Sequence, residues 1–403
     1  MSTRRAFLGQ AAAFALASPA ILRKARAAET PGVTSSEIKV GQTMPYRGPA
    51  SAYGAIGRTQ SAYVRMINES GGVNGRKINF ISLDDAYSPP KTVEQTRRLV
   101  EAEGVAFIHA SVGTPTNLAV REYLNNAKVP QLTIESGAGL FNDPERYPWS
   151  VPGIFQYRTD ARILAKLIQT TRPDAKIAVL YQNDDFGRDY LKGVQDHLGS
   201  ERASMLVKAV SYETTDPTVD SQIIALQSSG ADTLVIAATP KAAAQAIRKS
   251  YDLGWSPARY MSYVSASIPA VLKPAGIEKS KDIVTTAVLK DPSDPTWKDD
   301  PDVARYIGFM AKYMPGVSYT DYFATAGYTM GQLLVDIVKR SGDDLSRENL
   351  RKQAVTMKNF QASLGLPGVT YNLTPTDYTP IHQARLQKFD GESWRLFGDL
   401  LSG

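Results

Sequence analysis

The chain has 403 residues, and its 46 basic and 40 acidic side chains give a formal net charge of +6. Its 43% hydrophobic and 21% charged residues are typical of a globular protein and exclude a disordered or fibrous chain. A chain of this length is expected to fold into two or three domains. The absence of cysteine excludes disulfides, thiolate catalysis and Cys-bound metal centres. The three histidines, His109, His197 and His382, are too scattered for a His-rich metal site, so we expect neither metal nor cofactor.

The first 27 residues have the pattern of an export signal. Paired arginines, Arg4 and Arg5, precede an apolar run over 11–22 that is too short to anchor in a bilayer, and the segment ends in the cleavage pattern Ala25-Arg26-Ala27. The run Thr3-Arg4-Arg5-Ala6-Phe7-Leu8 resembles a twin-arginine signal. We therefore expect a signal peptide over 1–27, cleaved near Ala27, and a mature protein in the periplasm.

The excess positive charge lies in this same segment, which carries five basic and no acidic residues. Without it, 41 basic residues face 40 acidic ones, a net charge of +1. Nucleic-acid binding therefore loses the basic patch that it needs, and we expect no nucleic-acid partner. No later stretch is long and apolar enough for a transmembrane helix.

The mature chain alternates short apolar runs with longer amphipathic ones. The predicted strands of the first part are 38–43, 78–83, 105–110 and 129–134, and its predicted helices are 54–70, 92–103 and one that starts at Thr114. Thr114 is expected as the N-cap of that helix and Pro115 as its first residue, because both residue types are favoured there. Such alternation predicts a parallel sheet with right-handed crossovers.

The same alternation restarts after about residue 157. The predicted strands are 176–181, 205–210, 233–237 and 259–263, and the predicted helices are 160–171, 184–198, 217–228 and 240–251. The remainder holds a strand over 283–288, helices over 301–314, 320–341 and 346–357, and a hairpin formed by 381–389 and 394–397. This remainder is too small for a third domain. We therefore expect an α/β protein of two Rossmann-like, doubly wound lobes, which the remainder completes.

No motif of the sequence indicates catalysis. A G-x-S-x-G elbow, a G-x-x-x-x-G-K-[ST] phosphate loop and an H-E-x-x-H zinc motif are all absent. The acidic pairs Asp84-Asp85 and Asp184-Asp185 stand at strand ends and helix starts, where aspartate is common as a cap. His109, near a strand end, fits a buried hydrogen-bonded histidine better than a general base. We expect no enzymatic activity.

Three loops that follow predicted strands are rich in Gly, Ser, Thr and Tyr: 45–54, 112–116 and 135–138. In open α/β sheets ligands bind beyond the carboxyl ends of the strands. Free amides at a helix start together with hydroxyl groups suit an anion such as a carboxylate. Each loop alone is also an ordinary turn, but three of them on successive strands favour a ligand pocket.

Several short runs carry a resemblance to a known family. They are Ile38-Lys39-Val40-Gly41, Gly48-Pro49, Tyr53-Gly54, the run from Ile67 to Ile78 with its Glu69-Ser70-Gly71-Gly72-Val73-Asn74-Gly75 core, Asp84-Asp85, Asp185-Phe186-Gly187 and Gly230-Ala231-Asp232. From about Glu37 to Trp394 the chain resembles the type I periplasmic binding proteins. Within them it is most similar to the leucine/isoleucine/valine-binding group, which serves ABC transporters of hydrophobic amino acids.

The resemblance implies two lobes joined by three crossings, with the ligand cleft between the lobes. The crossings are expected near Val151, Thr285 and Gly368. The first lobe would then comprise 31–151 plus 285–367, and the second lobe 152–284 plus 368–403.

The resemblance also implies the ligand-binding residues. In the family, hydroxyls and amides after the third and fourth strands bind the ligand carboxylate. The matching positions here are Gly113, Thr114, Ser136, Gly137 and Ala138. A tyrosine of the first loop matches Tyr53, an aromatic residue of the second lobe matches Phe186, and Tyr46 and Tyr263 are further aromatic candidates for an aromatic or aliphatic acid.

Three features depart from the family pattern. Thr239 stands where amino-acid binders have a tyrosine, and Val264 stands where an acidic residue takes the ligand ammonium. Because burying an ammonium without a carboxylate is costly, either another acid such as Asp184, Asp185 or Glu135 replaces it, or the ligand has no amino group. Tyr87 and Val112 occupy the two positions at which many members carry a disulfide.

The function that the resemblance implies is capture and delivery. We expect the periplasmic substrate-binding component of an ABC uptake transporter, which closes over a small carboxylate ligand, either an amino acid or an aromatic or aliphatic acid without an amine. Its partners would be the permease and ATPase subunits at the inner membrane, and the protein is expected to be a monomer. The alternatives are a soluble ligand-sensing module of the same fold and, less favoured, an exported hydrolase.

Overall fold

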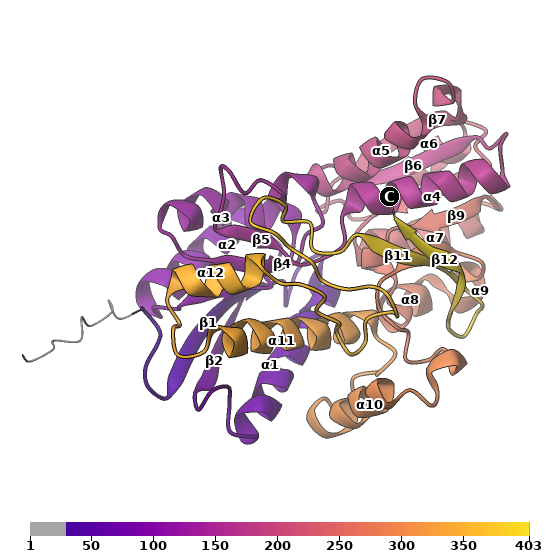
Figure 1. Cartoon of the computed structure of the whole chain (residues 1–403). Helices are drawn as coiled ribbons and strands as arrows, with labels where there is room; N and C mark the ends of the chain where they lie inside the picture. Colours follow the sequence, from indigo (N-terminus) through magenta and orange to yellow (C-terminus); the bar gives the residue numbers. More distant parts are fainter. Residues whose placement is uncertain (1–29, 403) are drawn as a thin grey trace, which may run out of the picture.

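The structure, a computed structural model, describes residues 30–402, so the predicted signal peptide lies outside the described residues. Two separate sheets form the two halves of the molecule (Figure 1). The first sheet is parallel with the order β2-β1-β3-β4-β5. Its strands are β1 (Glu37–Met44), β2 (Lys77–Asp84), β3 (Phe107–His109), β4 (Gln131–Ile134) and β5 (Ser150–Pro152).

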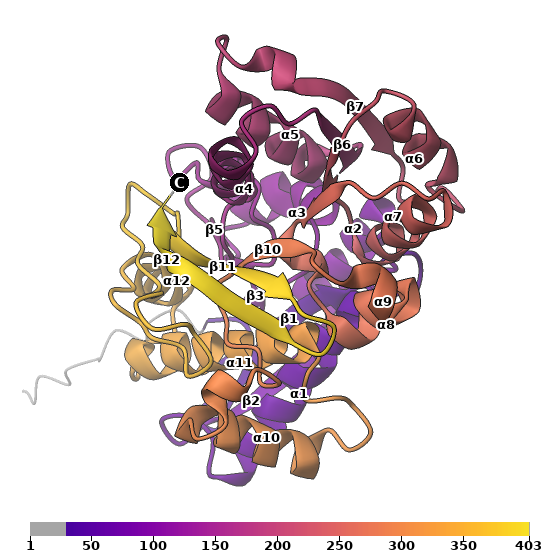
Figure 2. The same ribbon diagram turned by 90° about the vertical axis from the view of Figure 1, so that its right-hand side faces the viewer.

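The second sheet has the order β12-β11-β10-β9-β8-β6-β7. Its parallel strands are β6 (Ile177–Gln182), β7 (Leu206–Tyr212), β8 (Thr233–Ala237), β9 (Ala258–Met261) and β10 (Val284–Ala287). The hairpin of β11 (Gln383–Phe389) and β12 (Trp394–Ser402) adds two antiparallel strands beside β10 (Figure 2). This architecture confirms the predicted α/β fold with two doubly wound lobes.

Helices cover both sheets. They are α1 (Gly54–Glu69), α2 (Pro89–Arg97), α3 (Thr114–Asn126), α4 (Tyr157–Thr171), α5 (Asp185–Leu198), α6 (Asp220–Gln227), α7 (Pro240–Asp252), α8 (Lys273–Ala275), α9 (Ile277–Ser280), α10 (Pro301–Tyr313), α11 (Tyr322–Ser341) and α12 (Arg347–Val355). Shorter helical turns are η1 (Ser51–Tyr53), η2 (Arg98–Ala102), η3 (Gly139–Phe141), η4 (Ala203–Met205), η5 (Tyr263–Ser265), η6 (Ile268–Leu272) and η7 (Pro295–Trp297). Among residues 30–402, none of these helices has the length and hydropathy needed to cross a membrane.

The chain passes between the two sheets three times: between β5 and α4, after β10, and between α12 and β11. The predicted crossing residue Thr285 lies inside β10, so the chain leaves the second sheet only after Ala287. Helix α11 then packs along α1 of the first lobe (Figure 1). Gly327 permits this close approach, because a β-carbon there would lie 2.4 Å from the carbonyl oxygen of Ile56.

Most predicted elements are present with limits that differ by a few residues, and two local predictions were wrong. The N-cap of α3 is Gly113, not Thr114, because the backbone there has φ of 109°, a conformation that favours glycine. The strand predicted to reach Tyr263 ends at Met261, since Tyr263 begins the turn η5. Both differences lie at the carboxyl ends of strands, where the backbone turns toward the space between the lobes.

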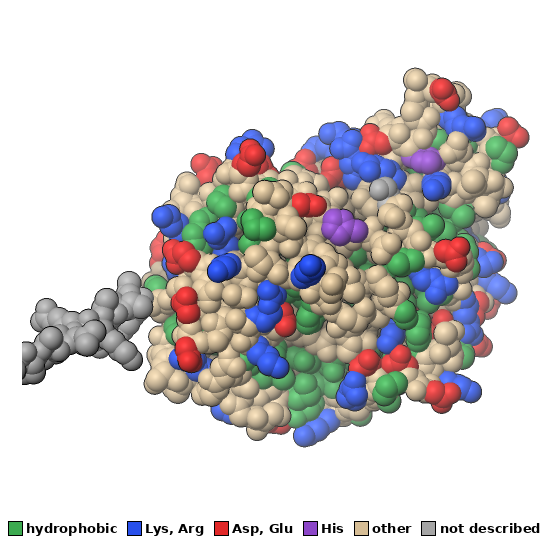
Figure 3. Space-filling model, in the orientation of Figure 1, with side chains coloured by type: hydrophobic (Ala, Val, Ile, Leu, Met, Phe, Trp, Pro, Cys, Tyr) green, Lys and Arg blue, Asp and Glu red, His purple; other side chains and the backbone are tan. Residues whose placement is uncertain are grey.

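The surface shows no separation of charge on the face drawn in Figure 3, where basic and acidic side chains are interspersed. Surface pairs such as Arg158 with Asp196 and Arg305 with Asp302 are part of this mixture. Such a face offers no extended basic field to a polyanion, which agrees with the near-neutral charge expected for the mature chain.

Candidate ligand-binding site

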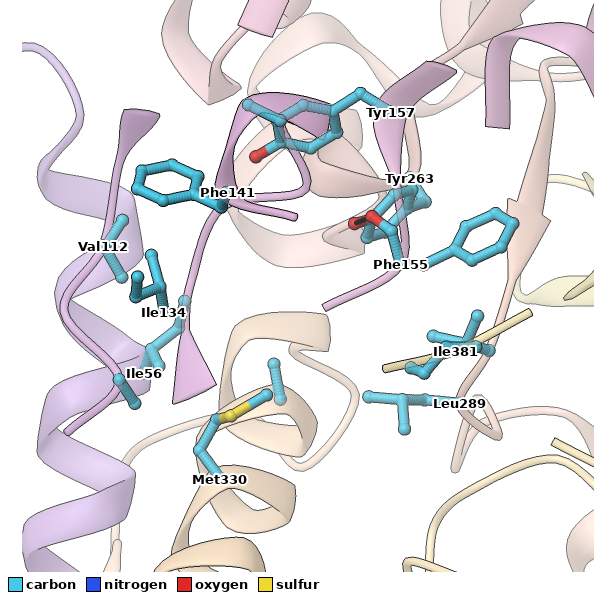
Figure 4. Close-up of a cluster of buried hydrophobic side chains, with 14 of the residues drawn as sticks. Ile56, Val112, Ile134, Phe141, Phe155, Tyr157, Tyr263, Leu289, Met330 and Ile381 are labelled. Atoms are coloured by element: carbon cyan, nitrogen blue, oxygen red, sulfur yellow. Dashed lines mark hydrogen bonds between the residues drawn. The ribbon is translucent and has the colours of Figure 1, made fainter. Parts of the chain in front are cut away.

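A cavity lies between the two lobes, with about 60 Å³ of space open to the centre of a water-sized sphere. Its wall comes from both lobes, from α11 and from the segments that follow β10 and precede β11. Figure 4 shows Ile56, Val112, Met330, Leu289 and Ile381 arranged around this common space.

Aromatic and aliphatic side chains dominate the wall. The aromatic residues are Tyr53, Tyr87, Phe155, Tyr157, Phe186, Tyr263, Tyr322, Phe323 and Tyr371. Several of these rings pack edge to face, with centroids 4.6 Å apart for Tyr157 and Phe186 and 5.0 Å apart for Tyr53 and Phe323. Interlocked rings make a rigid, apolar enclosure, which suits the hydrophobic body of a small ligand.

Five predicted site residues line this cavity: Tyr53, Gly113, Phe186, Thr239 and Tyr263. Phe186 is placed by the N-terminus of α5, where the Asp184 side chain accepts hydrogen bonds from the backbone amides of Phe186 and Gly187. The Tyr263 hydroxyl donates to the carbonyl oxygen of Phe155, at 2.5 Å, so this ring is anchored to the first crossing. Residues of both lobes therefore meet at one site.

Four other predicted residues, Thr114, Ser136, Gly137 and Ala138, do not line the cavity. The hydroxyls of Thr114 and Ser136 are 2.7 Å apart and hydrogen-bonded to each other, and both side chains are buried. Tyr157, which does line the cavity, packs against this group: its amide donates to the carbonyl oxygen of Gly137 at 2.9 Å, and its hydroxyl is within hydrogen-bonding reach of Ser136 and Thr114. The predicted carboxylate-binding group thus lies against the Tyr157 side chain and off the wall itself.

Tyr46 lies outside the cavity as well. Its hydroxyl is 2.6 Å from the Ser82 hydroxyl, and Arg58 stacks over its ring at 5.9 Å from the centroid. Its neighbour Arg47 is exposed and pairs with Asp84. The first loop therefore contributes Tyr53 to the cavity and uses Tyr46 to hold β1, β2 and α1 together.

Three acidic residues near the cavity, Asp184, Asp185 and Glu135, differ in their interactions and in whether they line the wall. Asp184 caps α5 and also accepts a hydrogen bond from the Gln182 side chain at 2.5 Å, and Asp185 pairs on the surface with Arg188. Neither aspartate lines the cavity, whereas Glu135 does, close to the start of α3. Of the acids that could replace the one missing at Val264, only Glu135 is therefore on the wall.

Glu135 is 8% exposed, and its Oε1 atom has no hydrogen-bond partner among the described residues. Burial raises the pKa of this carboxyl to about 8. Thr329 Oγ1 is a second buried oxygen on the wall without a partner in the described part of the chain. Unpartnered polar atoms in an otherwise apolar enclosure mark the points where a ligand can form hydrogen bonds.

Sequence reasoning missed most of the wall. Tyr322 and Phe323 open α11, and Tyr371 and Ile381 lie in the segment between α12 and β11, far along the chain from the predicted loops. The acidic N-cap of α11, Asp321, is the one local signal that marks the start of this helix. Nothing in the local sequence indicates that the helix start faces the cavity.

Comparison with known proteins decides the family. A family described as periplasmic binding protein matches residues 37–393. The chain belongs to this family. Because its members are binding proteins, the prediction that the chain is not an enzyme is confirmed.

Among curated proteins, the Leu/Ile/Val-binding protein homolog 7 of Brucella abortus (strain 2308) is 26% identical over 263 residues, which span 63% of this chain and 64% of that protein. The match thus covers slightly less than two thirds of the curated relative. Its name supports the resemblance to the leucine/isoleucine/valine-binding group.

Solved structures share the fold over nearly the whole chain. A branched chain amino acid ABC transporter protein from Thermus thermophilus with bound valine has a TM-score of 0.82 at 16% identity and covers 92% of this chain and 98% of its own. A solute binding protein of an ABC transporter from R. palustris in complex with 4-hydroxybenzoate has a TM-score of 0.76 at 18% identity, covering 91% and 97%. At such identities the likeness establishes the fold alone.

Proposed function

We propose that this protein is the periplasmic substrate-binding component of an ABC uptake transporter. It captures a small ligand that combines a hydrophobic body with a carboxylate, either an amino acid or an aromatic or aliphatic acid. The observation that carries this proposal is the enclosed aromatic cavity whose wall is built from both lobes. Two proteins of the same fold were solved with bound ligands, one with valine and one with 4-hydroxybenzoate, and both ligands belong to this class.

Hinge closure is the mechanism that this geometry supports. The two lobes touch beside the cavity, where the amide of Gly139 donates to Asp189 of α5 at 2.6 Å, and the Gln182 side chain is 3.5 Å from the Tyr87 hydroxyl. A ligand enclosed by both lobes enters only when these contacts open, and closure about the crossings then excludes water. Exclusion of water strengthens each polar contact to the ligand.

We propose that the lobes divide as predicted from the sequence, except at the second crossing. There the first lobe resumes after Ala287, the last residue of β10, and not at Thr285. The first and third crossings near Val151 and Gly368 lie at β5 and in the segment between α12 and β11.

The carboxylate is proposed to bind near the start of α3, at Thr114 and Ser136. The Tyr157 hydroxyl faces these two side chains, so a ligand carboxylate would take their hydrogen bonds by displacing it. The helix start adds backbone amides and a favourable dipole for an anion. Gly113, which lines the cavity at this point, leaves room for the approach.

The test is a ligand screen on the mature protein. Thermal shift with branched-chain and aromatic amino acids and with aliphatic and aromatic acids should identify a stabilising ligand, since a ligand at 100 times its Kd adds about 2.7 kcal/mol to the free energy of unfolding. Calorimetry should then give one ligand per chain, recovered chemically unchanged. Loss of uptake of that labelled compound on deletion of the gene would support transport. Conversion of the ligand, or no binding across the panel, would refute the proposal.

A further inference from the structure

The cavity wall carries one acidic side chain and no basic one among the described residues. Among the described residues that line it, Glu135 is the single carboxyl group and there is no lysine, arginine or histidine. The backbone of Glu135 is fixed, since its amide donates to Ser111 at 3.0 Å and its carbonyl accepts from Gly113 at 3.2 Å. The side chain therefore extends from a held position into an apolar enclosure, where its Oε1 atom has no partner in the described structure.

The electrostatic surroundings of Glu135 are acidic and aromatic. When ionised, Glu135 raises the pKa values of Tyr263, Tyr322 and Tyr371, which stand on η5, at the start of α11 and in the segment before β11. Asp160 of α4 acts on Tyr263 and Tyr322 in the same sense. Among the described groups that shift the pKa values of these three tyrosines, none is cationic, so nothing near these rings offers the Glu135 carboxyl a positive partner.

The faces of aromatic rings attract cations, and the attraction grows when water is excluded. A buried carboxylate, in turn, is stable only when it is paired and hydrogen-bonded. A ligand cation would displace the proton of Glu135 and pair with its carboxylate, whereas a wholly apolar group would leave Oε1 unpartnered. A protonated nitrogen meets all of these conditions at once, because it donates hydrogen bonds, carries the opposite charge and fits against the rings.

We propose that the ligand carries a protonated nitrogen on its apolar body and that Glu135 pairs with this nitrogen. The inference rests on the proposed function, in which the ligand class was left open between acids with and without an amine. Glu135 is then the specificity-determining residue of the cavity. It selects amino compounds, while the groups near Thr114 and Ser136 hold the carboxylate.

The experiment uses matched ligands that differ by one charged group. Phenylalanine and leucine are compared with their analogues without the amine, 3-phenylpropanoate and 4-methylpentanoate, and with the analogues without the carboxylate, phenethylamine and isopentylamine. Calorimetry on the mature protein should show that the better amino acid binds at least about 100-fold more tightly than its analogue without the amine. That ratio is what loss of one partner of a buried ion pair implies.

Glu135→Gln should remove this preference. Its affinity for the amino acid should fall about 100-fold, whereas its affinity for the acid without the amine should change by no more than about threefold. Asp185→Asn is the matched control, because it removes one acidic charge near the cavity without touching the wall. This variant should keep the wild-type preference. Glu135→Asp, which keeps the charge but withdraws it by one methylene, serves if the glutamine variant does not fold.

The outcomes separate the inference from the proposed function. Equal or tighter binding of the acids without the amine, or an unchanged preference in Glu135→Gln, would overturn the inference and leave the proposed function standing. Tight, Glu135-dependent binding of the simple amines would support the inference and refute the proposed need for a carboxylate. Failure of every acid to bind, with or without an amine, would refute the proposed function itself.

Discussion

Replacing His109 should change how the stability of this protein depends on pH. The ring is fully buried at the end of β3, between Phe80 and Phe107. Its Nε2 atom is 3.0 Å from the carbonyl oxygen of Met330 in α11, and its Nδ1 atom is 2.7 Å from the Thr133 hydroxyl. Because a carbonyl only accepts, Nε2 carries the hydrogen, while Nδ1 faces a hydroxyl that also lies 2.6 Å from the carbonyl oxygen of Leu132. The ring is thus buried and hydrogen-bonded, as the sequence predicts.

Burial lowers the pKa of His109 from 6.5 to about 3, and the hydrogen bond to Met330 opposes this shift only in part. The unfolded chain therefore takes up a proton more readily than the folded one. The contribution to stability is complete above pH 6.5 and is lost as the pH falls toward 3. With these two pKa values, the free energy of unfolding should fall by about 2 kcal/mol between about pH 7.5 and pH 5 through His109 alone.

His109→Gln removes the titrating group and retains an amide that can donate to Met330. The variant should be less stable than the wild type at about pH 7.5, by roughly 1–3 kcal/mol, because it loses packing of the ring. Urea unfolding at about pH 7.5, 6 and 5 should show this difference shrinking by about 2 kcal/mol toward the acid end. Other titrating groups are common to both proteins and cancel in the difference.

His382→Gln is the control, because it removes an exposed histidine and should follow the wild type at each pH. A stability difference between His109→Gln and the wild type that stays constant from about pH 7.5 to 5 would refute the reasoning. It would mean that the folded protein accommodates the imidazolium, which the full burial of the ring argues against.

Two further predictions concern the ligand site and the contact between the lobes, and a third concerns the stability of the loop after β2. Thr114→Ala and Ser136→Ala should each weaken binding of a carboxylate ligand by roughly three- to tenfold in calorimetry, without a change in fold by circular dichroism; unchanged affinity in both would contradict the carboxylate placement. Asp189→Ala removes the acceptor for the Gly139 amide, so it should destabilise the closed form and accelerate ligand release several-fold in stopped-flow measurements. Asp85→Ala removes two buried hydrogen bonds and should lower the free energy of unfolding by roughly 1–3 kcal/mol, measured with urea; a loss well below this would show that water replaces the carboxylate.

The order of strands and helices is predictable from the sequence because it depends on local patterns. The apolar run of β8 and the capping aspartate before α5 indicate their elements without any knowledge of the rest of the chain. The exact starts are harder, as α3 shows: its N-cap is Gly113, which has a positive φ and is closely approached by Thr116 and Tyr87. A side chain at Gly113 would lie 2.6 Å from the Tyr87 ring, and that contact is tertiary.

The candidate site is predictable only where topology alone places residues together. Tyr53 and Gly113 follow strands of one parallel sheet, so their proximity follows from the fold class. Tyr322 and Met330 reach the cavity because α11 packs against α1, and this depends on small residues such as Gly327 in a helix that follows α1 by more than 250 residues in the chain. No local pattern records such a contact. The Tyr157 side chain lies between Ser136 and the cavity, so it decides which groups the wall exposes. Its position results from side-chain packing, which no local sequence pattern predicts.

The missing disulfide and the chemistry of the cavity are linked by the loop after β2. Tyr87 and Val112, at the two positions where the resemblance places the half-cystines, both line the cavity. Without a covalent bond this loop is held by Asp85, which accepts from the Tyr87 amide and the Thr92 hydroxyl, each at 2.9 Å. The buried Asp85 carboxyl therefore holds the backbone of Tyr87, an aromatic residue at a position where many members of the family carry a half-cystine. Tyr87, Val112 and Glu135 thus share one wall, in which the carboxyl stands among apolar and aromatic groups and its burial raises its pKa to about 8.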